Sequence, residues 1–250
     1  MSDVHEPREW DGGLYDRIAD PMTRWGSTVL ERLPLAGDEV VLDAGCGSGR
    51  VTEQLLERLP QGRVIALDAS ASMLEAARER LAASLDRVQF VQADLGKPLP
   101  VTELVDAIIS TATFHWVPDH DALFRDLAAV LRPGGMLVAQ CGGLGNLERV
   151  MAAIDAVAPD DYRPWTFASP DETRRRLVSV GFLGVETWLN DEPTVIPAKD
   201  FETYLAEVVL GANLAKMPEE ARAPFVHAVA ERLPDHTLDY VRLNIIATRE

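Results

Sequence analysis

The sequence predicts an α/β fold in which a parallel sheet carries helices on both faces. From Val40 to Gln140, short apolar runs alternate with amphipathic segments of helical period, which is the pattern of consecutive βαβ units. The first apolar run also leads directly into a glycine-rich turn, as a strand does before its crossover helix. Because such crossovers are right-handed, we expect helices to cover both faces of the sheet.

Each element of this core follows from its own pattern. Residues 51–59 place Val51, Leu55, Leu56 and Leu59 on one helical face. Arg132-Pro133-Gly134-Gly135 should end the helix that precedes it. The expected strands of the core are 40–43, 63–68, 88–91, 106–110 and 136–140, and its expected helices are 51–59, 71–81 and 121–131.

The flanking segments are predicted to be mainly helical. Ser169 and Pro170 suit the N-cap and the first turn of one helix. The other expected helices are 14–33, 147–157, 201–215 and 218–233, and further strands are expected at 185–188 and 240–248. Since no repeat or linker divides the 250 residues, we expect a single domain.

Composition narrows the class of protein. The chain has 24 Lys and Arg against 40 Asp and Glu, a net charge of −16, which favours solubility and repels phosphate backbones. We therefore expect a small-molecule partner rather than nucleic acid. No segment approaches the ~18 apolar residues of a membrane span, and the N-terminus lacks signal-peptide features. These features predict a cytoplasmic protein without a membrane partner, either a monomer or a homodimer.

The two cysteines are predicted to remain free thiols. Cys46 and Cys141 follow the first and fifth expected strands, and we expect the fourth strand to lie between those two. Two strand spacings separate the cysteines by ~9.6 Å, beyond the ~7 Å limit between the Cα atoms of a disulfide. No spacing of His, Cys and Asp indicates a metal site.

The glycine-rich turn is the strongest indication of a ligand site. Asp43-Ala44-Gly45-Cys46-Gly47-Ser48-Gly49 follows the first strand, at the sheet edge where α/β proteins bind ligands. A tight turn without a ligand is the alternative. A dinucleotide fingerprint would need glycine at position 50, which is Arg50. Asp68 ends the second strand, where a carboxylate can accept both ribose hydroxyls of an adenosine. Its alternative role is the N-cap of the helix that follows.

The spacing D-x-G-x-G-x-G resembles motif I of the class I S-adenosylmethionine-dependent methyltransferases, and Arg132-Pro133-Gly134-Gly135 is also typical of them. This resemblance implies a Rossmann-like fold with a seven-stranded, mostly parallel sheet and an α-helical cap. It implies S-adenosylmethionine as cofactor, with Asp94 as acceptor for the adenine amino group. The cofactor-binding residues that it implies are Asp43, Gly45, Cys46, Gly47, Gly49, Asp68, Ala69, Met73, Asp94, Leu95, Thr111, Tyr15 and Arg24. Met73 could equally be a core residue, and Asp94 a loop-capping carboxylate.

Within that superfamily, the chain is similar to the trans-aconitate methyltransferase group in residues 114–120, in residues 164–170 and in the ending from Arg242. It departs from the group at His115, where Gln is usual, and at 211–214, where a Gly-Thr pair and an arginine are usual. The similarity implies a core at 35–145, an N-terminal lid at 1–34, an acceptor-covering elaboration at 146–235 and a final strand within 236–250.

The resemblance therefore implies O-methylation of a small carboxylic acid. The residues expected to contact this acceptor are His115, Trp116, Trp165, Arg149 and Arg242. A carboxylate is ionised at neutral pH and needs no base, whereas a hydroxyl or an acidic carbon would need His115 as catalytic base. O- or C-methylation of such a metabolite is one alternative. A regulatory protein that binds S-adenosylmethionine without turnover is another.

Overall fold

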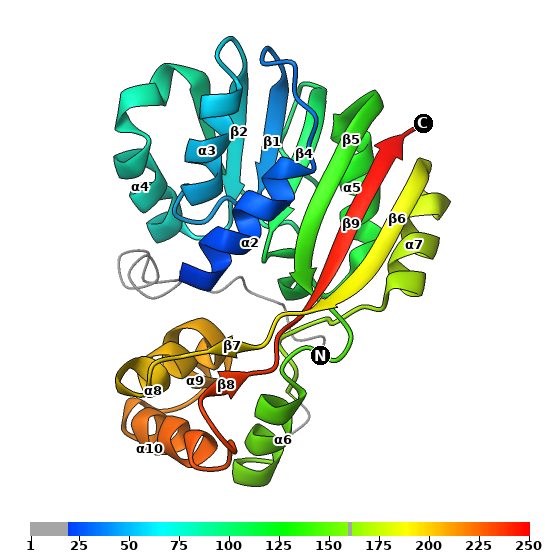
Figure 1. Ribbon diagram of the computed structural model, residues 1–250. Helices are drawn as coiled ribbons and strands as arrows, with labels where there is room; N and C mark the ends of the chain where they lie inside the picture. The colour runs from blue at the N-terminus through cyan, green and yellow to red at the C-terminus, as the bar shows by residue number, and fades with distance from the viewer. Residues whose placement is uncertain (1–19, 160–161) are drawn as a thin grey trace.

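The sheet of this chain has seven strands in the order β3-β2-β1-β4-β5-β9-β6 (Figure 1). The computed structural model describes residues 20–159 and 162–250. Strand β9 runs antiparallel to both of its neighbours, while the remaining pairs are parallel. This confirms the predicted mostly parallel sheet. The strands are β1 (Val40–Ala44), β2 (Arg63–Asp68), β3 (Val88–Gln92), β4 (Val105–Thr111), β5 (Leu131–Gly142), β6 (Phe182–Asp191) and β9 (Val241–Arg249).

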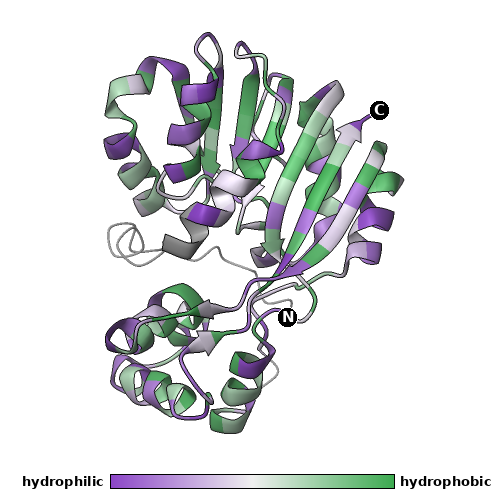
Figure 2. Cartoon of the chain, viewed as in Figure 1, coloured by the Kyte–Doolittle hydropathy of each residue, from purple (hydrophilic) through white to green (hydrophobic). Residues whose placement is uncertain are grey.

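Helices cover both faces of the sheet because both faces of its strands are apolar (Figure 2). Val41 of β1 points into a core shared with α2 (Asp20–Glu31) and α3 (Arg50–Arg58). Its neighbour Leu42 points to the opposite face, into a core shared with α5 (His120–Val130) and α7 (Pro170–Ser179). α4 (Ala71–Arg80) lies beside α3. The alternation of the side chains along β1 thus supplies two separate cores.

The predicted boundaries hold for α7 and change for β5. Ser169 is the N-cap of α7 and forms a capping box with Glu172, as its sequence indicates. α5 ends before Arg132-Pro133-Gly134-Gly135, but that segment lies within β5 rather than before a strand that begins at 136. The strand accommodates it through a bulge, because pairing with β4 shifts between Leu131 and Met136. Gly134 has φ +78°, which lets the extra residues loop out.

Segments from the second half of the chain form a cap at one end of the sheet (Figure 1). It has its own apolar core, built around residues such as Leu205 and Val229. Its elements are α6 (Glu148–Val157), β7 (Thr194–Val195), α8 (Phe201–Tyr204), α9 (Gly211–Ala215), α10 (Glu219–Ala230) and β8 (Thr237–Leu238). Short 3₁₀ segments lie at Ala82–Arg87 (η1), Phe114–Trp116 (η2) and Ala198–Asp200 (η3).

The cap contains two features that the sequence did not predict. The expected continuous helix 201–215 is interrupted by a π-helical turn, η4 (Leu205–Val209). There the Leu210 N–H donates to the Leu205 carbonyl at 2.7 Å, one residue further than in an α-helix. The pair β7–β8 was missed as well, because two-residue strands are too short to show an alternating pattern.

The cysteine prediction is confirmed. Strand β4 lies between β1 and β5, and Cys46 and Cys141 are both buried, free thiols.

Candidate functional site

The glycine loop between β1 and α3 needs the backbone freedom of glycine. The N–H groups of Gly45 and Cys46 both donate to the Leu67 carbonyl of β2, at 2.8 and 2.9 Å. Gly45, Gly47 and Gly49 have φ of +85°, +54° and +81°, which only glycine adopts readily. A Cβ on Gly45 would lie 2.3 Å from Thr113, whereas a Cβ on Gly47 would meet no atom of the described residues within 4 Å. Among these residues, the loop therefore leaves open space beside Gly47.

Asp43 lies beneath this loop rather than on its surface. Its side chain is fully buried and accepts a 2.6 Å hydrogen bond from the Thr52 hydroxyl of α3. Burial, reinforced by the charge of Asp68, raises the pKa of Asp43 to about 7. Its Oδ1 atom has no hydrogen-bond partner among the residues described. Asp43 thus links β1 to the start of α3 below the loop through Oδ2, while Oδ1 accepts no hydrogen bond from the described residues.

Asp68 connects the end of β2 to the glycine loop. Its Oδ2 accepts from the Gly47 N–H at 2.8 Å, and its Oδ1 accepts from the Ser70 N–H at 2.9 Å. The N-cap of α4 is Ser70, whose hydroxyl accepts from the Met73 N–H, so the alternative role of Asp68 as the N-cap is wrong.

The other predicted cofactor residues lie near the same sheet edge. Met73 is buried at the start of α4, next to Ala69 in the β2–α4 turn. Asp94 follows β3 and accepts from the Gly96 N–H at 2.8 Å, a loop-capping contact, and Leu95 beside it is buried in the sheet core. Thr111 ends β4. These residues follow parallel strands that end at the same edge of the sheet, so they lie near one another. Their contacts with a ligand remain predictions.

A second site lies between the carboxyl edge of the sheet and the cap. It is a pocket with about 420 Å³ of empty volume, including its opening to solvent. Trp165 and Phe167 stack in its wall with ring centroids 5.7 Å apart. Within residues 20–159 and 162–250, the lining residues are Ala112, His115, Trp116, Asn146, Leu147, Trp165, Phe167, Val208, Val209, Tyr240 and Arg242, none of which is acidic.

Strained backbone is concentrated at this pocket. Ala112 and Leu147 have φ of +54° and +57°, and they are the non-glycine residues with positive φ in the part of the chain that is described. Both line the pocket. The Ala112 N–H donates to the Gln140 carbonyl at 2.7 Å, and the Leu147 N–H donates to the Asp239 carbonyl at 2.9 Å. Such strain persists where surrounding contacts enforce it, and it clusters at functional sites.

His115 is held as a neutral hydrogen-bond donor. It is buried in the pocket wall, and its Nδ1 accepts from the Gly142 N–H at 3.2 Å. Burial, together with the nearby Arg242 and His120, lowers the pKa of His115 well below its ordinary value. A neutral imidazole with Nδ1 as acceptor carries its proton on Nε2. His115 therefore offers an N–H to the pocket rather than a lone pair.

Arg242 brings a fixed positive charge to the same pocket. Its side chain is only 2% exposed, and it pairs across the sheet with Gly142. Its guanidinium lies over the Trp25 ring, 4.5 Å from the centroid. The guanidinium therefore has a fixed place at the junction of sheet and cap, and Arg242 is one of the residues that line the pocket.

Comparisons with known proteins agree with this architecture. A family model described as a methyltransferase domain matches residues 41–135. The chain is 32% identical over 266 aligned positions to the trans-aconitate 2-methyltransferase of Methylobacterium nodulans, and the match covers 96% of this chain and 98% of that protein. The chain belongs to the trans-aconitate methyltransferase family. The methyltransferase resemblance read from the glycine loop is thereby confirmed.

Two further comparisons are more limited. One matches about half of a curated relative, and the other shows a likeness of fold alone. The trans-aconitate 2-methyltransferase of Azoarcus sp. is 43% identical over 131 residues, which is 52% of this chain and 50% of that protein. The chain thus spans about half the length of the first relatives that it matches. The solved structure of Haemonchus contortus phosphoethanolamine N-methyltransferase 2 has a TM-score of 0.61 at 22% identity, covering 91% of this chain and 52% of that one.

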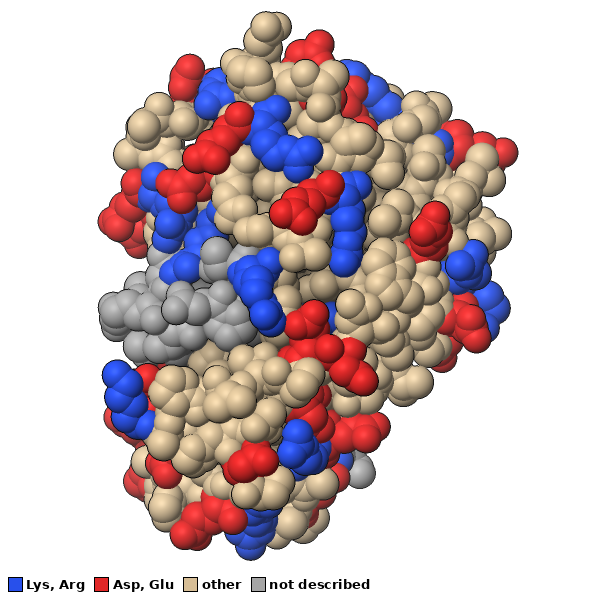
Figure 3. Space-filling view, in the orientation of Figure 1, with Lys and Arg blue, Asp and Glu red and all other residues tan. Residues whose placement is uncertain are grey.

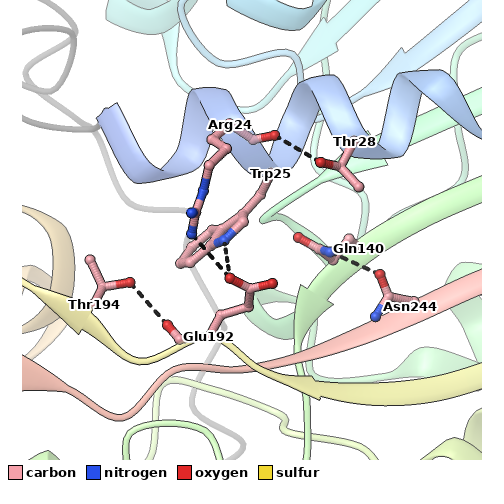
Figure 4. Close-up of polar contacts among 7 residues, drawn as sticks. All are labelled: Arg24, Trp25, Thr28, Gln140, Glu192, Thr194 and Asn244. Atoms are coloured by element: carbon pink, nitrogen blue, oxygen red, sulfur yellow. Dashed lines mark hydrogen bonds and ion pairs between the residues drawn. The ribbon is translucent and has the colours of Figure 1, made fainter.

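Two of the arginines predicted to bind ligands lie away from the pocket. Arg149, proposed for the acceptor, is 40% exposed and pairs with Asp239 at 3.8 Å, outside the pocket lining. Arg24, proposed for the cofactor, pairs with Glu192 at 3.1 Å, and Glu192 also accepts from the Trp25 indole (Figure 4). Both are satisfied by local carboxylates, which sequence spacing does not reveal. Tyr15 lies outside the described residues.

Sequence reasoning missed Asn146, which lines the pocket. Its Oδ1 accepts from the Val241 N–H at 2.9 Å, which fixes the orientation of the amide. The signal available in the sequence was the glycine-rich run Gly142-Gly143-Leu144-Gly145 directly before it, which resembles the other strand-end turns. Tyr240 was also missed, and its hydroxyl lies 3.1 Å from that of Tyr204.

On the face drawn in Figure 3, acidic and basic side chains of the described residues are interspersed. They form no large patch of a single charge there. Among the helices that the structure describes, none has the length and apolar character needed to cross a membrane. Within the same residues, no group of three His, Cys, Asp or Glu side chains is placed to hold a metal ion.

Proposed function

We propose that this protein transfers a methyl group from S-adenosylmethionine to a carboxylate oxygen of a small organic acid of the trans-aconitate type. The observation that carries the proposal is the pocket at the sheet edge, in which a neutral His115 donor and the Arg242 charge occur, and in which none of the lining residues that the structure describes is acidic. Such a set of groups favours an anion. The relatives named trans-aconitate 2-methyltransferase support the same acceptor class.

The glycine loop fits S-adenosylmethionine. A Cβ on Gly47 would occupy open space, so a ligand can approach the backbone there. Asp68, at the end of β2, supplies a carboxylate for the ribose hydroxyls, and Asp94 follows the adjacent strand β3 for the adenine. We assign Gly45, Gly47, Asp68, Met73 and Asp94 to this site. Solved relatives of the same fold include one described in complex with S-adenosyl-L-methionine.

The chain has little covalent chemistry to perform. When bound, S-adenosylmethionine supplies a methyl group on a positively charged sulfur that is ready to leave as a neutral thioether. His115 donates Nε2–H to the acceptor and holds it in the pocket. Trp165 and Phe167 exclude water from one side. Orientation and exclusion of water are what such a transfer needs.

His115 is poorly suited to act as a base. Its Nδ1 lone pair is occupied by the Gly142 N–H, and Nε2 already carries the proton, so no lone pair faces the acceptor. An ionised carboxylate needs no base, whereas a hydroxyl or an acidic carbon does. The arrangement therefore favours the carboxylate over the hydroxyl and carbon acceptors.

The chemical nature of the product provides the decisive test. The protein is incubated with S-adenosylmethionine labelled in the methyl group and with trans-aconitate, and the product is then treated with alkali. A methyl ester releases its label as volatile methanol, whereas a methyl ether or a C-methyl product keeps it. We expect the label to be volatile. A stable methylated product would replace this proposal by the hydroxyl or carbon alternative, and binding without turnover would favour the regulatory protein.

Several expectations stay predictions within this proposal. The segment 1–34 would close over the cofactor, and 146–235 would cover the acceptor. A monomer or homodimer, a cytoplasmic location and the absence of a nucleic-acid partner stay expectations, the last of them from the net charge of −16.

A further inference from the structure

Three side chains of the pocket meet at the end of the β5–β9 pair. Arg242 belongs to β9, and His115 and Asn146 accept hydrogen bonds from backbone N–H groups there. Gly142 of β5 pairs with Arg242 of β9. The Gly142 N–H occupies Nδ1 of His115 at 3.2 Å, and the neighbouring Val241 N–H occupies Oδ1 of Asn146 at 2.9 Å. The N–H groups of the ladder thus use the Nδ1 lone pair of His115 and one lone pair of Asn146 Oδ1, which leaves Nε2–H of His115 and the NH₂ of Asn146 as donors.

The neutral donor and the charge are neighbours in the pocket, but they are anchored to different parts of the molecule. His115 belongs to η2, directly after Thr113, whose hydroxyl donates to the Gly45 carbonyl of the glycine loop at 3.3 Å. Arg242 lies over Trp25, whose side chain packs in the cap core. His115 is therefore tied to the cofactor side of the pocket, and Arg242 is tied to the cap side.

The chemistry of the transfer indicates which group should hold the reacting carboxylate. An oxygen lone pair of the carboxylate forms the new O–CH₃ bond, the methyl–sulfur bond breaks with its electron pair kept by sulfur, and no proton moves. The attacking carboxylate loses its negative charge along the way. A guanidinium paired with that carboxylate would stabilise the ground state more than the transition state and slow the reaction. Neutral donors hold the reacting group with a smaller penalty of this kind.

We propose that His115 and Asn146 hold the reacting carboxylate, while Arg242 binds a second carboxylate of the same acceptor. This inference rests on the proposed function and adds to it a division of roles. The acceptor is then a di- or tricarboxylic acid whose second carboxylate fixes which oxygen is methylated. The charge of Arg242 supplies affinity and selectivity, and the two neutral side chains supply alignment.

Steady-state kinetics on two acids test this division. Trans-aconitate carries the second carboxylate, and crotonate is a matched acid with one. We expect wild-type protein to prefer trans-aconitate by at least about 100-fold in kcat/KM. Arg242→Gln should raise KM for trans-aconitate by about 10- to 100-fold, change kcat by less than about 5-fold, and reduce the preference to within about 10-fold. Asn146→Asp retains the acceptor for Val241 and replaces the donor by a like charge, so kcat should fall by at least about 100-fold.

Controls separate folding, function and the inference. Arg174→Gln removes an exposed arginine of α7 and should leave both acids unaffected. Affinity for S-adenosylhomocysteine and thermal unfolding report the integrity of each variant, and Arg242→Lys, which should keep most of the preference, replaces Arg242→Gln if the latter misfolds. A collapse of kcat in an intact Arg242→Gln on both acids would overturn the inference, because the reacting carboxylate would then lie on Arg242. If wild type methylates neither acid, the proposed function fails. Calorimetry of trans-aconitate on the S-adenosylhomocysteine complex then decides whether Arg242 still binds a carboxylate, and no binding refutes both.

Discussion

The open space beside Gly47 predicts a substitution that separates folding from cofactor binding. Gly47 and Gly134 have φ of +54° and +78°, and a Cβ on either would meet no atom within 4 Å in the part of the chain that the structure describes. Alanine at either position should therefore cost only the left-handed backbone, about 1–2 kcal/mol of unfolding free energy. In a chain of this size that lowers Tm by roughly 2–8 °C. The two variants, Gly47→Ala and Gly134→Ala, are thus matched in stability.

Their ligand affinities should differ. If the adenosyl ligand lies against Gly47, the added methyl group overpacks that contact at a cost of about 1–3 kcal/mol, which weakens binding by roughly 5- to 150-fold. Gly134 lies in the bulge of β5, so Gly134→Ala should bind as wild type does. Calorimetry with S-adenosylhomocysteine, beside thermal unfolding of all three proteins, makes the measurement. Equal affinity of Gly47→Ala and wild type would show that the space beside Gly47 is not the cofactor site.

Three more predictions concern the same loop and its surroundings. Asp68→Ala should weaken S-adenosylhomocysteine by about 1–3 kcal/mol, the loss of charged hydrogen bonds, and unchanged affinity in calorimetry would exclude ribose binding there. Because the pKa of Asp43 is raised to about 7, the folded state binds this proton more tightly than the unfolded chain, and its contribution to stability falls as pH rises from about 4 to 7. Asp43→Asn should therefore gain unfolding free energy relative to wild type over that range in urea titrations; a constant difference would contradict the assigned burial. Titration of denatured, non-reduced protein should find two thiols, from Cys46 and Cys141, and finding none would reverse the assigned state.

The central sheet was predictable because both of its faces are buried. Val41 and Leu42 enter opposite cores, so β1 reads as a continuous apolar run, and the same holds for β4. The glycine loop was predictable because three positive φ values within five residues demand glycine. These features are local, and a local pattern is what a sequence displays directly.

The acceptor pocket was only partly predictable because its members meet through long-range pairing. Arg149 and Arg242 look alike in sequence, and they are separated by the register that places Arg242 opposite Gly142 while Asp239 pairs with Arg149. Asn146 acquires its role from the N–H of Val241, which lies 95 residues away. Residue type alone does not encode such contacts, so the sequence identified His115 and the aromatic residues but not the complete set of donors.

The strained residues at the pocket connect these observations. Ala112 follows β4 and Leu147 follows the turn after β5, and both accept a left-handed backbone that costs each about 1–2 kcal/mol. Their N–H groups are held by the carbonyls of Gln140 and Asp239, so the β-ladder and the cap enforce the strain. Each strained residue lies close in sequence to a donor. Ala112 precedes η2, which carries His115, and Leu147 directly follows Asn146. The backbone is therefore strained next to the two neutral donors. Such strain is expected where the positions of these side chains matter for function.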